Sequence, residues 1–204
     1  MLVKICGVRD PDIALVALES GADLVGMVFA PSRRRVTPAE AEAIARAVPD
    51  RRRLVGVFVD APAEVVRGAV QAYGLAYAQL SGDESPEYCD GLGVPVLKAI
   101  RPAGPDGARL ARVYASVSPL LLVDANVPGA HGGTGALADW TLAAEVAAEV
   151  PTLLAGGLTP GNVAAAIRAV RPAGVDVSSG VEVDGRKSVE LIRRFIQAVR
   201  EVTT

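Results

Sequence analysis

The chain has 204 residues, of which 50% are hydrophobic and 22% charged, so it is long enough for one globular domain with a large apolar core. The formal net charge of -2 supplies no basic field of the kind that nucleic-acid binding needs, and we expect no nucleic-acid partner. The longest apolar runs are too short to span a bilayer, and the N-terminus lacks a signal-peptide pattern. We therefore expect a cytoplasmic protein with no membrane partner.

Cysteine and histidine are rare in the chain. Cys6 and Cys89 are the only cysteines, and His131 is the only histidine. Two thiols do not suggest a disulfide framework, and nothing near them has zinc-ligand spacing, so we expect no metal site. The positive charge comes almost entirely from arginine, because there are only three lysines, Lys4, Lys98 and Lys187.

A short apolar run, a turn and a longer segment with helical periodicity recur along the whole chain. The apolar runs predict eight strands, at Leu2 to Cys6, Asp23 to Phe29, Arg53 to Val59, Ala76 to Leu80, Val94 to Ile100, Leu120 to Asp124, Thr152 to Ala155 and Gly174 to Ser178. The periodic segments predict eight helices, at Asp12 to Ser20, Pro38 to Val48, Pro62 to Tyr73, Ser85 to Leu92, Asp106 to Ala115, Asp139 to Glu149, Pro160 to Val170 and Ser188 to Val202. Thr37 and Thr159 each precede a proline, which predicts a capping hydroxyl followed by proline at the first helical position.

Apolar strands separated by helices predict a parallel sheet that is buried on both faces. Eight such units favour an α/β fold consisting of a single (β/α)8 TIM barrel over residues 1–204. An open doubly wound sheet is the alternative, but the Gly-x-Gly-x-x-Gly motif expected after its first strand is absent.

In a barrel the reactive groups lie at the carboxyl ends of the strands. Cys6, Asp124 and Asp176 fall at or near such ends. Gly156 and Gly157 follow strand seven, and Ser179 and Gly180 follow strand eight. Backbone N–H groups at these four positions can approach an anion without obstruction, so the two loops together predict a phosphate site, although each alone is equally typical of a tight turn.

Six blocks of sequence share their order with a known family. The chain resembles the phosphoribosylanthranilate isomerase family essentially from end to end, through Lys4-Ile5-Cys6-Gly7, Gly26-Met27-Val28-Phe29 with Ser32-Arg33-Arg34, Leu122-Val123-Asp124, Gly132-Gly133-Thr134-Gly135, Ala155-Gly156-Gly157-Leu158 with Asn162-Val163, and Asp176-Val177-Ser178-Ser179-Gly180-Val181-Glu182. The resemblance implies conversion of N-(5-phosphoribosyl)anthranilate to 1-(2-carboxyphenylamino)-1-deoxyribulose 5-phosphate in tryptophan biosynthesis. This Amadori rearrangement requires no cofactor.

The reaction needs an acid for the ring oxygen and a base for the proton on the adjacent carbon. The resemblance implies that Cys6 is the base and Asp124 the acid. As a base Cys6 must supply thiolate, so its surroundings should lower its pKa. As an acid Asp124 must hold a proton, so an apolar pocket or an anionic substrate should raise its pKa. Without the family context, Cys6 is more typical of a small buried residue and Asp124 equally of a turn cap.

The resemblance also implies residues that bind the substrate. Arg34 should pair with the anthranilate carboxylate, with Arg33 and Arg35 as alternatives because this segment is one residue shorter than expected for the family. Further substrate contacts are implied at Gln79, Gly133 and Asp176. Lys4 and Asp176 should both point into the barrel on adjacent first and last strands, where they can form an ion pair. The chain departs from the family pattern in having Ser81 where histidine is usual and Ala138 where phenylalanine is usual.

Other readings stay open at this point. Indole-glycerol-phosphate synthase, the histidine-pathway aminoaldose isomerase and a pentose-phosphate epimerase share the phosphate site, although one histidine cannot build the metal centre of the epimerase. A phosphosugar-binding module without turnover is a further alternative, which the presence of Cys6 and Asp124 argues against. The partner we expect is a small phosphorylated aminosugar, bound by a monomer or a homodimer.

Overall fold

The structure, a computed structural model, describes residues 1–102, 107–124 and 138–203. Eight parallel strands close into a barrel in which each strand pairs with the next along the chain and β8 pairs with β1. The strands are β1 (Leu2–Cys6), β2 (Leu24–Val28), β3 (Leu54–Phe58), β4 (Tyr77–Leu80), β5 (Val96–Ile100), β6 (Leu121–Val123), β7 (Thr152–Leu154) and β8 (Gly174–Val177). The predicted (β/α)8 barrel is confirmed.

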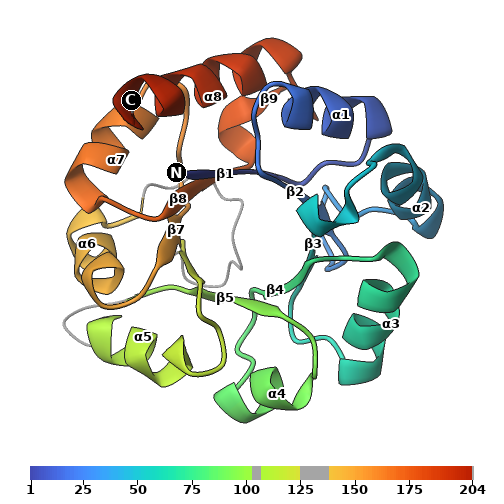
Figure 1. Ribbon diagram of the computed structural model, residues 1–204, viewed down its shortest axis with the longest axis horizontal. Coiled ribbons are helices and arrows are strands. Elements are labelled where there is room, and N and C mark those ends of the chain that lie inside the picture. Colours follow the sequence, from blue (N-terminus) through green and yellow to red (C-terminus); the bar gives the residue numbers. More distant parts are fainter. Residues whose placement is uncertain (103–106, 125–137, 204) are drawn as a thin grey trace.

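Helices form a ring around these strands (Figure 1). They are α1 (Pro11–Glu19), α2 (Pro38–Ala47), α3 (Ala63–Tyr73), α4 (Pro86–Gly91), α5 (Gly107–Ala115), α6 (Trp140–Glu149), α7 (Val163–Val170) and α8 (Val189–Thr203). A short 3-10 helix, η1 (Arg51–Arg53), precedes β3. Within the described ranges, no helix combines the length and the apolar character that crossing a membrane requires.

Local signals set where the helices begin. The Thr37 hydroxyl accepts from the Glu40 backbone N–H at 3.2 Å, and the Glu40 carboxylate accepts from the Thr37 N–H, so the predicted cap of α2 is a full capping box. The predicted start of α7 is wrong. Thr159 and Pro160 form a turn in which the Thr159 carbonyl accepts from the Asn162 and Val163 N–H groups, and the helix begins at Val163.

The strands separate two groups of apolar side chains. A small cluster faces the barrel interior, and a much larger one fills the space between the strands and the helices. The interior cluster contains Leu24, Val55, Leu97, Ala99, Leu122, Leu153 and Ala155. Because side chains alternate along a strand, the inward positions above this cluster carry the residues at the carboxyl-terminal mouth of the barrel.

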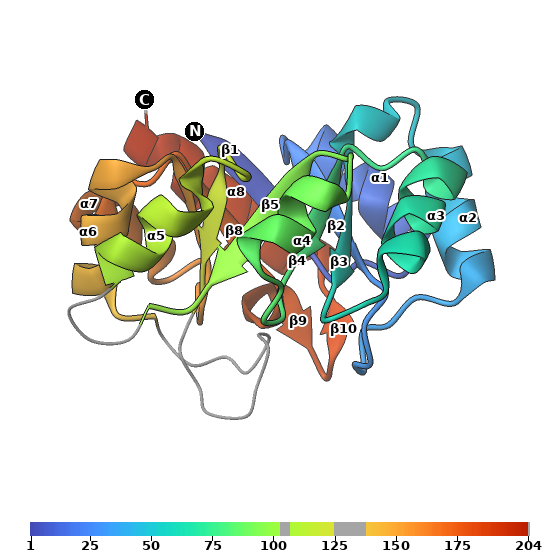
Figure 2. The same ribbon diagram turned by 90° about the horizontal axis from the view of Figure 1, so that it is seen from below.

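A hairpin that the sequence patterns did not predict follows the last barrel strand. After the 3-10 helix η3 (Ser179–Val181), β9 (Glu182–Val183) pairs antiparallel with β10 (Arg186–Lys187). Asp184 and Gly185 connect the two strands, with φ of 49° and 76°. Figure 2 shows the hairpin projecting on the side of the barrel away from both chain ends.

Candidate active site

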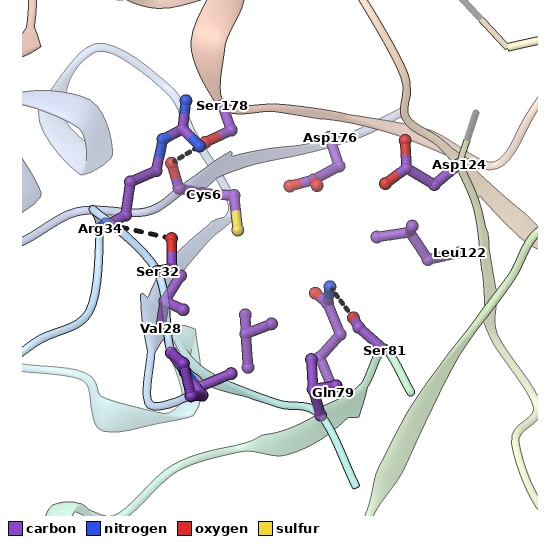
Figure 3. Close-up of a pocket in the computed structure, with 14 residues that line it drawn as sticks. Cys6, Val28, Ser32, Arg34, Gln79, Ser81, Leu122, Asp124, Asp176 and Ser178 are labelled. Atoms are coloured by element: carbon purple, nitrogen blue, oxygen red, sulfur yellow. Dashed lines mark hydrogen bonds between the residues drawn. The ribbon is translucent and has the colours of Figure 1, made fainter. Parts of the chain in front are cut away.

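A cavity of about 440 Å³ lies at the carboxyl-terminal mouth of the barrel. This volume is in the usual range for small-molecule sites. Its apolar wall consists of Val28, Ala30, Pro31, Val57, Val59 and Leu122. Its polar side chains are Cys6, Ser32, Arg34, Gln79, Ser81, Asp124, Asp176 and Ser178 (Figure 3).

Cys6 and Asp124 enter the cavity from different strands. Cys6 is the last residue of β1 and is 7% exposed, and Gly7 turns the chain immediately after it with a φ of 75°. Asp124 directly follows β6, where its N–H donates to the Ile100 carbonyl at 3.1 Å. Figure 3 shows the two side chains projecting from opposite sides of the cavity. The two candidate acid–base groups therefore share one site and face each other across it.

An ion pair lies on the inner wall beneath Cys6. Lys4 on β1 and Asp176 on β8 are register partners, and Lys4 Nζ is 2.8 Å from Asp176 Oδ1. Lys4 is fully buried, whereas Asp176 also lines the cavity. The predicted internal ion pair is confirmed, and it leaves one Asp176 oxygen outside that contact.

The surroundings of Cys6 act on its thiol in opposing directions. Burial raises the pKa of Cys6, the positive charge of Lys4 lowers it, and the negative charge of Asp176 raises it again, with a net rise above the ordinary value. The surroundings of Cys6 therefore raise its pKa rather than lower it, because desolvation outweighs the charge of Lys4. Burial also disfavours the Lys4 ammonium, but Asp176 and Cys6 together raise the pKa of Lys4 above its usual value.

Arg34 is the buried member of the arginine run and the one that lines the cavity. Arg35 is exposed, and the Arg33 side chain is 60% exposed. Arg34 forms a two-point ion pair with Glu182, through Nε to Oε1 at 2.7 Å and Nη2 to Oε2 at 2.9 Å. A guanidinium has five N–H donors, and within the described residues those on Arg34 Nη1 have no acceptor, which leaves them for an anionic ligand.

Glu182 forms ion pairs with two further cations at the rim of the cavity. Lys187 Nζ donates to Glu182 Oε1 at 2.7 Å, and Arg33 Nη2 donates to Oε2 at 2.9 Å. Burial by itself would raise the pKa of Glu182, but hydrogen bonds from Arg34 and Lys187 lower it to about 2. Lys187 also donates to the Ser178 carbonyl at 2.9 Å, which connects the rim to the end of β8.

Gln79 and Ser81 form a polar edge on the β4 side of the cavity. Gln79 Nε2 donates to Ser81 Oγ at 3.1 Å, and both residues are buried. Gln79 Oε1 is buried with no hydrogen-bond partner in the described part of the chain. A buried acceptor without a partner is costly, and it fits a ligand that brings a donor.

The two predicted phosphate loops touch each other beside the cavity. Gly156 and Gly157 have φ of 84° and 62°, which are left-handed conformations that favour glycine. A Cβ on Gly180 would overlap the Leu158 carbonyl oxygen, so η3 packs directly on the loop after β7. Within the described ranges, no hydrogen bond from the backbone N–H groups of Gly157, Ser179 or Gly180 is found.

The structure does not bring every predicted site residue to one surface. The cavity wall reaches Ser178 but none of the four phosphate-loop residues, which form a separate part of the mouth. Gly133, together with the segment 132–135, lies outside the described residues. Glu182 belongs to a family block that implies no role for it, and no sequence pattern points to Lys187. The Asp184-Gly185 pair, a typical two-residue hairpin turn, is the signal that could have placed both at the rim.

Comparisons with known proteins agree with this geometry. The family model described as N-(5'-phosphoribosyl)anthranilate (PRA) isomerase matches residues 3–198. The chain is 52% identical over 208 residues to N-(5'-phosphoribosyl)anthranilate isomerase of Roseiflexus sp. (strain RS-1), with 97% of each chain covered. The crystal structure of phosphoribosyl anthranilate isomerase from Thermotoga maritima has a TM-score of 0.88 at 36% identity, covering 98% of this chain and 99% of that one.

A solved complex is also similar. It is a phosphoribosyl anthranilate isomerase in complex with reduced 1-(o-carboxyphenylamino)-1-deoxyribulose 5-phosphate, and it has a TM-score of 0.84 at 35% identity. The match covers 98% of this chain and 100% of that one.

Proposed function

The chain belongs to the N-(5'-phosphoribosyl)anthranilate isomerase family, and on that premise we propose that Cys6 and Asp124 are the general base and general acid of its reaction. The enzyme isomerises N-(5-phosphoribosyl)anthranilate to the corresponding 1-deoxyribulose 5-phosphate in tryptophan biosynthesis. The observation that carries the two assignments is that both side chains enter one cavity from opposite sides. A sugar ring between them meets an acid on one face and a base on the other.

The proposed rearrangement begins with two proton transfers that involve the enzyme and ends with a tautomerisation. Asp124 gives its proton to the furanose ring oxygen, the bond from C1 to that oxygen breaks, and the nitrogen lone pair completes an open-chain iminium. The Cys6 thiolate then removes the proton from C2, and the electrons of that C–H bond form the enolamine. The enolamine tautomerises to the ketone. Asp124 ends deprotonated and Cys6 protonated, so both must exchange protons before the next turnover.

The two anionic ends of the substrate fit different parts of the mouth. We assign the anthranilate carboxylate to Arg34, because this guanidinium is buried at the cavity wall and keeps donors beyond those used by Glu182. We assign the phosphate to the backbone N–H groups of Gly156, Gly157, Ser179 and Gly180, where glycines leave the backbone open to an anion. The analogue bound by the similar solved complex carries both groups.

We assign the sugar hydroxyls to the polar side chains between the two anion sites. Gln79 Oε1 offers an acceptor that has no partner among the described residues, and Asp176 lines the cavity with a carboxylate of which only Oδ1 contacts Lys4. Ser81 occupies less volume than the histidine usual in the family, so we assign Gln79 the main contact on this side.

Turnover by substituted enzymes tests the acid–base assignment. Cys6→Ser preserves size but supplies a far weaker base, and Asp124→Asn removes the acidic proton, so each should lower kcat by at least about 10²-fold. Cys89→Ser is the matched control, because Cys89 is also a buried cysteine but lies on α4 outside the cavity wall. Cys6→Ser should fail to complement a tryptophan auxotroph that lacks this isomerase, whereas Cys89→Ser should complement it.

Near-wild-type turnover by Cys6→Ser or Asp124→Asn would remove the corresponding role. Asp176 would then be the next carboxylate to test, because it lies between the two groups in the same cavity. If the unmodified chain bound the reduced product analogue but showed no turnover, it would be a binding module without catalysis.

A further inference from the structure

The side chains of all three lysines are buried and ion-paired. The side chains of Lys4, Lys98 and Lys187 are 0, 3 and 6% exposed, and each has a carboxylate oxygen within 2.8 Å. Lys98 pairs with Glu84 behind β5, away from the cavity, and Lys187 pairs with Glu182 at the rim. Lys4 differs from both because its ammonium lies inside the barrel beneath the proposed base. Burying a charged ammonium costs free energy unless nearby groups offset it, so we ask which groups the Lys4 ammonium serves at this position.

Gly26 shows how near the Lys4 ammonium is to the Cys6 thiol. Gly26 is the register partner of Cys6 on β2. A Cβ placed on Gly26 would lie 3.0 Å from Cys6 Sγ and 3.1 Å from Lys4 Nζ. Both atoms therefore converge on one point of the β2 backbone, where the missing side chain leaves room for them.

We propose that Lys4 is a positioning residue that stabilises the thiolate form of Cys6, and that Asp176 limits this effect by sharing the same ammonium. The inference rests on the proposed role of Cys6 as base. In this arrangement the cation sits between two anionic groups, the Asp176 carboxylate on β8 and the thiolate on β1. Attraction between charges is strong in an interior that excludes water, so removing the charge of either Lys4 or Asp176 should change the pKa of the thiol.

Other charged groups also face Cys6. Lys187 on β10 contributes positive charge, Arg34 from the loop after β2 lies beside Gly7, and Asp124 faces Cys6 across the cavity. Lys187 and Arg34 are both ion-paired with Glu182, which offsets part of their positive charge. Lys4 lies on the same strand as Cys6. Among the neighbouring charges, that of Lys4 has the largest effect on the pKa of Cys6, and it lowers this pKa.

Two substitutions that should shift the pKa of Cys6 in opposite directions test the proposal. Lys4→Met removes the cation and leaves Asp176, so the pKa of Cys6 should rise by at least about one pH unit. Asp176→Asn keeps a hydrogen-bond acceptor for Lys4 but removes the opposing negative charge, so the pKa of Cys6 should fall. Lys98→Met is the matched control, because it also breaks a buried lysine–carboxylate pair but lies outside the cavity.

The measurement is the rate of iodoacetamide alkylation of Cys6 from about pH 6 to about pH 11, because burial already raises the pKa of this thiol, followed by mass spectrometry of the peptide that contains it. Thiolate is the reacting form, so the midpoint of this profile reports the pKa of the thiol. A loss of stability alone would not move the midpoint in opposite directions in two variants. The pH profile of kcat/KM for the same proteins supplies an independent readout.

An unchanged midpoint in Lys4→Met, or an equal shift in Lys98→Met, would overturn the proposal. If Lys4→Met does not fold, Asp176→Asn decides, since an unchanged or higher midpoint in that variant contradicts the proposal equally. The alkylation and kcat/KM profiles separate the proposed effect of Lys4 on the thiol from the proposed role of Cys6 as general base. Shifted alkylation with an unshifted kcat/KM profile supports the role of Lys4 and removes Cys6 from proton abstraction.

Discussion

Glu182 is the residue on which three cations converge at the mouth of the barrel. Its carboxylate accepts from Arg34, Lys187 and Arg33 at 2.7 to 2.9 Å. One carboxylate therefore pairs with three cations, so these four side chains together carry an excess of positive charge. This excess favours a substrate with a carboxylate and a phosphate. The two-point contact also fixes the plane of the Arg34 guanidinium before any ligand arrives.

Removing the Glu182 charge should weaken substrate binding more than it slows the chemical step. In Glu182→Gln the Arg34 guanidinium loses its fixed orientation, so we expect KM to rise about tenfold with a smaller change in kcat. Steady-state kinetics measures the split between the two parameters. Glu149→Gln is the matched control, because Glu149 makes a similar two-point pair with Arg112 on the exposed helices. A KM that falls in Glu182→Gln would show instead that Glu182 competes with the substrate for Arg34.

At the scale of elements, the two phosphate loops form one unit because η3 packs on the backbone after β7. A Cβ on Gly180 would overlap the Leu158 carbonyl oxygen and lie 2.8 Å from its carbonyl carbon. The obstacle is backbone, which cannot rotate away as a flexible side chain can. Gly180→Ala must therefore separate the loops that we propose bind the phosphate together.

We expect Gly180→Ala to weaken the binding of inorganic phosphate and of substrate by about tenfold or more, and to lower Tm by several degrees. Gly161→Ala is the control in the partner loop after β7, since its Cβ would meet only Thr159 Oγ1 at 3.8 Å, an ordinary contact. Phosphate titration by calorimetry and a thermal melt of both variants measure the two effects. Tight phosphate binding by Gly180→Ala would place the phosphate elsewhere in the mouth.

The sequence predicts the elements well but predicts contacts between distant elements poorly. Apolar runs and periodicity were sufficient for all eight barrel strands, and alternation placed Lys4 and Asp176 on the inner wall. The contact between Arg34 and Glu182 joins residues 148 positions apart, and no local pattern indicates such a pair. The hairpin β9–β10 was missed because each strand has only two residues, too few for a period-two pattern. The net effect of burial on Cys6 depends on packing, which residue types alone do not determine.

At the scale of the whole molecule, the ion pairs that shape the site also affect folding stability. Lys4 with Asp176 and Lys98 with Glu84 are almost completely buried, and removing one partner of a buried pair typically costs about 3–5 kcal/mol. Variants at Lys4 and Lys98 should therefore lose comparable stability. Their effects on the thiol should differ, because only Lys4 lies beside it. Stability and activity can thus be separated by comparing the two.

The low pKa of Glu182 makes part of the stability depend on pH. Its carboxyl has a pKa of about 2 in the folded chain, against an ordinary value of 4.5. A depressed folded-state pKa contributes stability that is fully present above the unfolded value and is lost as pH falls through the folded value. The free energy of unfolding of the wild type should therefore exceed that of Glu182→Gln most clearly near pH 7. The difference should shrink progressively below about pH 4.5.

Urea unfolding of both proteins at pH 7, 5.5, 4.5 and 3.5 measures this difference. The comparison isolates Glu182, because every other carboxyl titrates in both proteins and cancels to first order. Glutamine resembles the protonated glutamic acid, so the two proteins should become alike as Glu182 gains its proton. Glu149→Gln should show a smaller change over the same range, since exposed pairs contribute little. A constant difference between pH 7 and 3.5 would mean that Glu182 stabilises the fold through packing rather than through its charge.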